Sequence, residues 1–148
     1  MITRVAAPSA EWLSLRRALW PDCPEDEHLS EMAEFAADPT RFAQFLARSP
    51  AGEAIGLAEV AVRTDYVNGT ESSPVAFLEG LYVAPPHRNE GVARGLVAEV
   101  ENWARERGLR ELASDTQLDN LQSQAVHGAL GFTETERVVY FRKAVQPR

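Results

Sequence analysis

Cysteine is nearly absent from this sequence. Among 148 residues the only cysteine is Cys23, so no disulfide can form within the chain. The three histidines, His28, His87 and His127, show no metal-ligand spacing with one another or with that cysteine. We therefore expect neither a disulfide framework nor a bound metal.

Long hydrophobic runs and a surplus of positive charge are also missing. No segment reaches the roughly 18 uncharged apolar residues that a membrane span needs, and the N-terminal MITRVAAPSAEW lacks the apolar core of a signal peptide. The formal net charge is −7, which argues against a nucleic-acid partner and mildly for a cationic one. We expect a cytoplasmic protein that binds neither membranes nor nucleic acid.

The amino-acid composition is typical of one globular domain. Apolar residues make up 45% and charged residues 25%, and no repeat, linker or low-complexity tract divides the chain. A chain of this size can bury about 70% of the surface that its unfolded form exposes. We expect a single domain over residues 1–148.

The spacing of apolar residues predicts a mixed α+β fold. Helical spacing follows a short strand in the first half, and strand-like runs dominate from Gly52 onward. The series strand, helix, strand between Val75 and Ser114 is a crossover unit whose two strands should be parallel neighbours. The expected strands are 2–5, 54–64, 75–83, 111–116 and 137–143, and the expected helices are 9–20, 24–37, 39–49, 92–107 and 119–131.

Residues 87–91, HRNEG, form a glycine loop between a strand and a helix. Backbone N–H groups in the first turn of a helix have no intrahelical partner, and the helix dipole adds positive charge there, so phosphate binds well at such a point. Gly91 lacks the Cβ that would keep an anion away, and Arg88 and Arg94 supply guanidinium groups suited to phosphate oxygens. An ordinary loop with solvated arginines is the alternative.

Two motifs carry a family resemblance. The pattern Arg88-x-x-Gly91-x-Ala93 after an apolar strand resembles the acetyl-CoA pyrophosphate loop of the GCN5-related N-acetyltransferases, the GNAT superfamily. Downstream, Asn120 and the helix that ends in AVHGALGF resemble the second cofactor motif of the same superfamily. The resemblance implies a GNAT fold, which is a central, mostly antiparallel mixed sheet with a splayed parallel pair at strands 4 and 5, flanked by helices.

The resemblance then narrows to the small, dimeric aminoglycoside 6′-N-acetyltransferases. It covers nearly the whole chain except about residues 36–54, and it rests on the stretches LWPDCPEDEHLSEM, DYVNGTESSPVAFLEGLYV, ELASDTQLDN and HGALGFTETERVVYFRK. It implies a homodimeric antibiotic-resistance enzyme that transfers an acetyl group directly from acetyl-CoA to the 6′-amine of a polycationic aminoglycoside.

The resemblance also implies a set of cofactor-binding residues. A bulge near Gly80 would leave backbone N–H groups free for the thioester and the pantetheine arm; for Gly80 the alternative is a packing glycine in a strand. Asn120 would reach the cofactor from the following helix. The other implied residues are Leu81, Tyr82 and Val83 beside the arm, and Arg88, Asn89, Glu90, Gly91, Val92 and Ala93 around the pyrophosphate.

On the acceptor side the resemblance implies acids and aromatic rings. Glu79, Asp115 and Glu136 would line one mouth as ionised carboxylates for the ammonium groups, although each acid taken singly could be a solvated surface residue. Trp20 and Tyr66 would offer flat surfaces to sugar rings and ring faces to cations. For Trp20 the alternative is partial burial beneath a loop.

Acyl transfer requires a neutral amine, and an amine with a pKa near 10.4 is less than about 0.1% neutral at pH 7. We expect Glu79 to be the general base, directly or through a water, with Asp115 as the alternative; either acid could instead only bind the ammonium. Tyr140 is the candidate acid for the leaving thiolate. It precedes Phe141, whereas the resemblance places the tyrosine one position later, on the opposite face of a strand.

Two other functions remain open at this level. The acceptor could be a polyamine or a peptide amine, which would use the same acids. A non-catalytic CoA-binding sensor is the third possibility, and the loss of Glu79 or Asp115 would have been its sign, yet both residues are present. Cys23 and His127 are not expected to act as catalysts, because direct transfer needs no covalent nucleophile.

Overall fold

The computed structural model describes all 148 residues, which form two compact units, residues 1–115 and 116–148. The first unit contains a five-stranded sheet in the order β1-β2-β3-β4-β5. Pairing is antiparallel from β1 to β4 and parallel between β4 and β5, which confirms the expected mixed sheet with a parallel pair at strands 4 and 5. The strands are β1 (Ile2–Arg4), β2 (Phe42–Arg48), β3 (Ala54–Arg63), β4 (Val75–Val83) and β5 (Leu112–Ala113).

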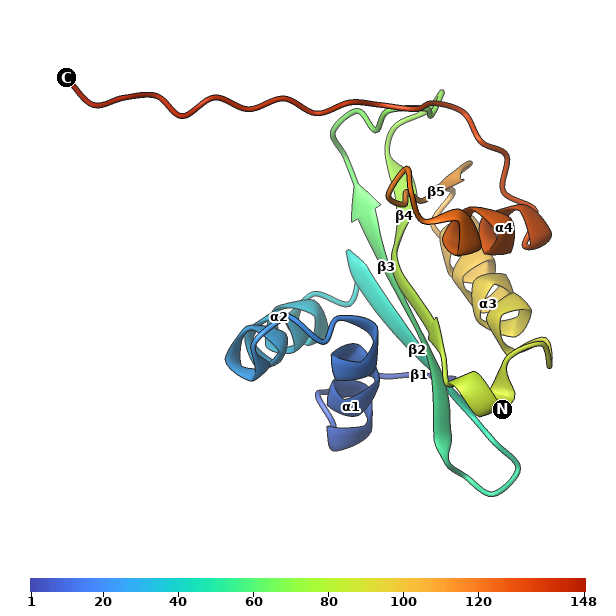
Figure 1. Cartoon of the computed structure of the whole chain (residues 1–148). Coiled ribbons are helices and arrows are strands. Elements are labelled where there is room, and N and C mark those ends of the chain that lie inside the picture. The colour runs from blue at the N-terminus through green and yellow to red at the C-terminus, as the bar shows by residue number, and fades with distance from the viewer. The chain divides into compact units, whose positions relative to one another are not determined.

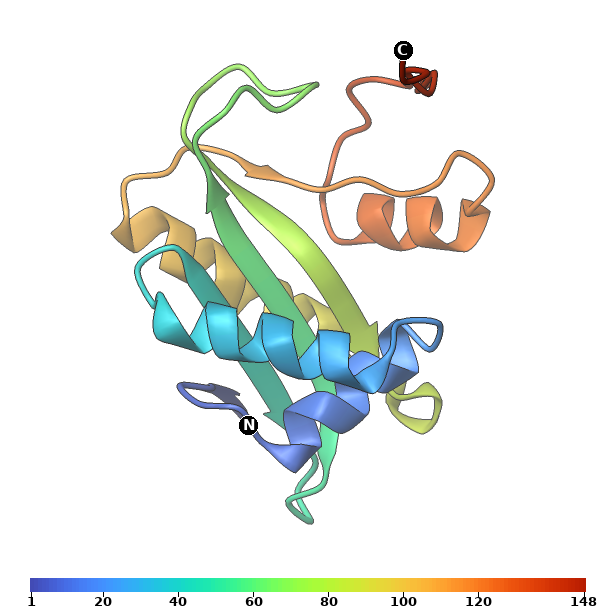
Figure 2. The ribbon, with the colours of Figure 1, turned by 90° about the vertical axis from the view of Figure 1, so that its left-hand side faces the viewer.

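Helices cover both faces of this sheet (Figures 1 and 2). Helices α1 (Ala10–Leu19) and α2 (Glu25–Ala37) lie on one face, and α3 (Val92–Glu106) lies on the other. The Ser9 side chain caps α1 by accepting a hydrogen bond from the Trp12 N–H at 3.1 Å. Both layers confirm the helices expected over these residues.

The sheet is buried between two apolar helix surfaces. On the α1 and α2 side, Trp12, Leu15 and Met32 pack on Leu46 and Leu57 of the sheet. On the other side α3 buries the apolar stripe that its sequence spacing predicts, namely Leu96, Val97, Val100, Trp103 and Ala104. The sheet therefore has no solvated face across its centre.

The expected helix at residues 39–49 is wrong, because residues 42–48 form strand β2. Phe42, Phe45 and Leu46 are spaced as on one helical face, which favoured the helix. β2 lies between β1 and β3, and its residues 43–47 are all buried. A strand that is covered on both faces reads as a continuous apolar run, and periodicity does not separate such a run from a short helix.

The second unit contains helix α4 (Leu121–Ala129) followed by an extended tail. The Asn120 carboxamide oxygen caps α4 by accepting from the Ser123 N–H at 3.0 Å. The expected strand at residues 137–143 does not form. This unit has no strand to pair with, and Val139, Tyr140 and Phe141 are 71%, 81% and 92% exposed.

None of the helices combines the length and the apolar composition that a membrane crossing requires. No three histidine, cysteine or acidic side chains gather in a way that could hold a metal ion.

Candidate functional site

A bulge interrupts the pairing of β3 and β4 at the centre of the sheet. Glu59 lies opposite Gly80, but the next residue, Val60, lies opposite Leu78, so Glu79 is the extra residue of β4. The expected bulge near Gly80 is confirmed. Because the bulge leaves Glu79 without a cross-strand partner, its side chain is set at an irregular point of the ladder.

The other edge of β4 is open beyond the bulge. β5 pairs with β4 only at Ala76 and Phe77, so no strand of the first unit's sheet covers this edge of Leu81, Tyr82 and Val83. These residues were expected to meet the pantetheine arm. An uncovered strand edge presents the free backbone groups that such an extended ligand can use.

Gly80 allows an aromatic ring to lie directly on β4. A Cβ at this position would come within 2.6 Å of Trp20 Cη2 and 2.8 Å of Trp20 Cζ2. The packing role considered for this glycine is therefore real, and it coexists with the bulge. Trp20 is placed against the strand segment that carries Glu79.

A cleft of about 740 Å³ lies beside this ring and is formed by the first unit alone. Five carboxylates and two guanidinium groups line it, so its wall carries an excess of negative charge at neutral pH. The lining residues are Arg16, Leu19, Trp20, Pro21, Asp22, Cys23, Glu31, Glu34, Phe35, Arg41, Phe42, Glu59 and Glu79.

Of these lining residues, the sequence had assigned only Trp20 and Glu79 to the site. The sequence signal for Glu31 and Glu34 was the acidic face of the segment EDEHLSEMAEFAA, whose apolar stripe faces the core. That face looked like an ordinary solvated helix surface. Only the packing of α2 beside β2 turns part of it toward a cleft.

The floor of the cleft is a buried ionic cluster around Arg16, which is 1% exposed. Arg16 Nη1 donates to both oxygens of Glu59 at 2.6 and 2.7 Å, Nε donates to His28 Nδ1 at 3.1 Å, and Nη2 donates to Glu31. Trp12 Nε1 adds a 2.7 Å bond to Glu59. Burial raises the pKa of Glu59, while Arg16 and Trp12 act against that rise. The cluster ties α1 and α2 to β3.

Glu79 has a different environment at the edge of the cleft. Its side chain is 32% exposed, and Arg63 donates to it from Nε at 3.0 Å and from Nη2 at 2.9 Å. Burial is the main cause that raises the pKa of Glu79; Arg63 lowers it, and the charges of Asp115 and Glu59 raise it further. A carboxylate with a raised pKa accepts a proton more readily than an ordinary surface glutamate.

Asp115 lies near enough to Glu79 for its charge to raise the pKa of the Glu79 carboxyl. Asp115 is exposed and follows β5 at the end of the first unit. Tyr66 lies in the loop before β4, is 70% exposed and does not line the cleft. In the second unit Glu136 is exposed and Tyr140 lies in the extended tail.

The glycine loop has the backbone geometry that an anion site requires. Asn89 and Gly91 have positive φ angles of 65° and 82°, and Gly91 is the N-cap of α3, which begins at Val92. A Cβ on Gly91 would meet nothing within 4 Å, so the φ angle and not space accounts for the glycine. The space beside Gly91 is therefore open, and the first-turn amides of α3 follow it without intrahelical partners.

The charged side chains of this loop fold back onto the protein. Arg88 Nε donates to the Val83 carbonyl at 2.9 Å, which places the guanidinium beside the end of β4. A Glu90 carboxylate oxygen lies 3.6 Å from His87 Nδ1.

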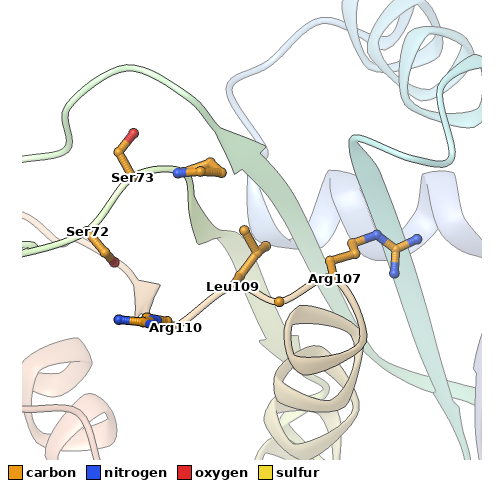
Figure 3. Close-up of a pocket in the computed structure, with 7 residues that line it drawn as sticks. Ser72, Ser73, Arg107, Leu109 and Arg110 are labelled. Carbon is orange, nitrogen blue, oxygen red and sulfur yellow. The ribbon is translucent and has the colours of Figure 1, made fainter.

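A second, smaller hollow of about 370 Å³ lies where α3 ends (Figure 3). It is lined by Ser72, Ser73, Pro74, Arg107, Gly108, Leu109 and Arg110, none of which was expected in a site. The Arg107 guanidinium points away from the two serines in Figure 3 and stacks on Trp103 at 4.1 Å. The carboxyl end of a helix also disfavours an anion.

Comparisons with known proteins agree with this geometry. Residues 11–132 match the model of the acetyltransferase (GNAT) family. The chain is 54% identical over 134 residues to an aminoglycoside N(6′)-acetyltransferase type 1 of Serratia marcescens, covering 90% of this chain and 91% of that protein. A protein of the same name from Acinetobacter baumannii is 52% identical over 136 residues, 92% of each chain.

Solved structures give the same result. The aminoglycoside 6′-N-acetyltransferase AAC(6′)-IG of Acinetobacter haemolyticus superposes with a TM-score of 0.90 at 45% identity over 99% of both chains. AAC(6′)-Iy, solved with the bisubstrate analogue CoA-S-monomethyl-acetylneamine, also has a TM-score of 0.90 at 45% identity, over 98% of both chains.

Proposed function

The chain belongs to the acetyltransferase (GNAT) family, and we propose that it transfers the acetyl group of acetyl-CoA to the 6′-amine of aminoglycoside antibiotics. The acidic cleft that ends at Glu79 is the observation that carries this proposal. Relatives at 50% identity or more are named for the same transfer, and a neighbour is solved with an analogue in which CoA is joined to acetylneamine.

The cleft suits a polycationic sugar. Ammonium groups gain from an excess of carboxylates, and the Trp20 ring supplies a flat surface for a sugar ring. Asp22, Glu31 and Glu34 extend the acidic wall away from Glu79, which gives room for amines other than the one that reacts. Tyr66 and Glu136 are proposed as further contacts with the aminoglycoside on the strength of the family resemblance.

Glu79 is proposed as the general base. Acetyl-CoA supplies an acetyl group activated as a thioester. The amine nitrogen must lose a proton as it forms the new N–C bond, and Glu79 takes that proton directly or through a water. The raised pKa of the Glu79 carboxyl supports this role over that of a purely ionic anchor. Asp115 is the alternative base, and Tyr140 is the candidate acid that protonates the departing thiolate.

The residues around the glycine loop fit the diphosphate of acetyl-CoA. We assign its oxygens to the amides of residues 88–93 and to the Arg88 guanidinium, because positive φ angles, as at Asn89 and Gly91, are typical of backbone nests that bind anions. The open edge of β4 at Leu81, Tyr82 and Val83 is assigned to the pantetheine arm. Asn120 is proposed as an additional cofactor contact.

An acceptor panel tests the proposed activity. Release of the CoA thiol is followed with an aminoglycoside that carries a 6′-amine, its 6′-hydroxyl counterpart, spermidine and a peptide. Turnover with the 6′-amine alone is expected. Turnover with spermidine or the peptide alone would reject the aminoglycoside in favour of another amine, and no turnover with any acceptor would favour a CoA-binding sensor.

We also propose a cytoplasmic homodimer. Acetyl-CoA is available in the cytoplasm, and the tail of the second unit exposes an apolar run that is typical of a strand lacking its neighbour. Residues 138–141 of a second copy could supply that pairing. Light scattering of the full chain should give the mass of two copies, and the double variant Val139→Asp, Phe141→Asp should give one. A monomeric full chain would reject the dimer.

A further inference from the structure

Arg63, the last residue of β3, is held in place by two neighbouring side chains of β4. Its Nε and Nη2 donate separately to the two oxygens of Glu79, at 3.0 and 2.9 Å. Its guanidinium carbon also lies 3.5 Å from the centre of the Phe77 ring, and Phe77 is 4% exposed. A planar fork with two bonds and a ring beneath it has little freedom to swing away.

We propose that Arg63 is a positioning residue for acetyl transfer, which orients the Glu79 carboxylate and keeps it ionised so that it can accept the proton of the acceptor amine. This inference rests on the proposed function. Arg63 acts through Glu79 and does not itself need to touch the aminoglycoside.

The hydrogen bonds leave Glu79 able to act as a base. An ionised carboxylate has about four acceptor positions on its two oxygens. The Arg63 fork occupies one position on each oxygen, so the remaining lone pairs are available to an ammonium group or a water in the cleft. Arg63 therefore fixes the direction of the carboxylate without using up its capacity to accept a proton.

The charges around Glu79 give Arg63 a second role. Glu59 on β3 and Asp115 after β5 both raise the pKa of the Glu79 carboxyl, as burial does, and Arg63 is the group that lowers it. Of the two cations that line the cleft with Glu79, Arg16 of α1 is bound to Glu59, and Arg41 lies over the Phe42 ring at 5.0 Å. Without Arg63 the pKa of Glu79 would lie still higher, and as the pH falls a larger fraction of the enzyme would hold a protonated, inactive base.

The experiment measures kcat/KM for a 6′-amino aminoglycoside from about pH 5.5 to 9 in Arg63→Gln and Arg63→Lys. Arg63→Gln is expected to lose more kcat/KM at pH 6 than at pH 9, because removing the cation that lowers the pKa of Glu79 moves the acidic limb of the profile to higher pH. Arg63→Lys keeps the charge without the fork, so it should recover part of the loss at pH 6.

The matched control is Arg48→Gln. Arg48 makes a similar two-bond pair with Glu11, at 2.6 and 2.8 Å, and both side chains are partly exposed. Arg48 does not line the cleft. Its pH profile should therefore overlay that of the unmodified enzyme, which separates the loss of any surface ion pair from the loss of this one.

A titration of ¹³C-labelled glutamate carboxyls by NMR, with Glu79→Gln to assign the signal, supplies a readout that needs no activity. The midpoint of Glu79 should move to higher pH in Arg63→Gln. An unmoved midpoint, or a loss of kcat/KM by one factor at every pH, overturns the inference. If the unmodified enzyme does not acetylate the 6′-amine, the proposed function is rejected instead. The NMR midpoint then still shows whether Arg63 lowers the pKa of Glu79.

Discussion

Two arginine–glutamate pairs lie at the same bulge, one at the floor of the cleft and one at its edge. Glu59 and Arg16 have side chains 4% and 2% exposed, whereas Glu79 and Arg63 have side chains 32% and 42% exposed. At the floor, each of the three guanidinium nitrogens of Arg16 donates to a neighbouring side chain. At the edge, the glutamate keeps lone pairs for a ligand.

The difference indicates how one ion-pair type serves structure in one place and chemistry in another. A buried pair that loses one partner leaves an uncompensated charge in a poorly solvated site, so the floor resists change. A half-exposed pair can exchange protons with a ligand and with solvent. The floor should therefore determine stability, and the edge should determine activity.

The largest expected effect is on the floor. Arg16→Met removes the cation that bonds Glu59, His28 and Glu31, and we expect the free energy of unfolding to fall by about 3–5 kcal/mol. Urea denaturation measures it. The double variant Arg16→Met, Glu59→Gln should regain part of the loss, because no buried charge is then left alone. A loss of less than about 1 kcal/mol in the single variant would contradict the expectation that the buried pair determines stability.

At the edge, Glu79→Gln should cost activity and leave the fold intact. Removing a general base lowers kcat by about 10²–10⁴-fold, whereas the amide keeps the shape of the carboxylate. Steady-state kinetics with the 6′-amino acceptor, together with acetyl-CoA affinity by calorimetry, should show a lost kcat at unchanged affinity. Glu101→Gln, on the exposed face of α3, is the control. Loss of acetyl-CoA affinity would mean that Glu79 faces the cofactor instead.

Between floor and edge, Gly80→Ala tests the contact that joins them. The added Cβ would press on Trp20 at 2.6 Å, and we expect a loss of about 1–3 kcal/mol from overpacking and a raised KM as the ring is displaced. Thermal unfolding and kinetics measure the two effects. Gly128→Ala in α4 has open space around its Cβ, so it should be neutral or stabilising by up to about 1 kcal/mol.

The bulge at the edge of the cleft could be predicted from a local motif. Glu79, Gly80 and the glycine loop lie within one short stretch, and the resemblance carried their roles. The caps Ser9 and Asn120 each bond to an N–H three residues later, so the signal of a cap lies in its neighbours along the chain.

The floor was not predictable, since its partners are distant in sequence. Arg16 and Glu59 are 43 residues apart, and the sequence around either residue does not indicate that the other is its partner. The same limit explains β2, whose burial depends on the strands beside it, and the tail at residues 137–143, where strand-like composition does not supply a neighbouring strand. In all three cases the outcome depends on whether a distant segment packs beside the residues, whereas periodicity describes only one segment at a time.

The smallest expected effect belongs to a pair outside the cleft. Arg17 and Glu25 join α1 to α2 at 3.6 Å, but their side chains are 60% and 58% exposed. Solvent screens such a pair, and holding two long side chains together costs entropy, so Arg17→Gln should leave both stability and kcat/KM nearly unchanged. Urea denaturation and the acceptor assay, run beside Arg16→Met, measure both. Since the two arginines are adjacent on one helix, a loss comparable to that of Arg16→Met would show that removal of charge from α1, and not burial of the pair, sets the cost.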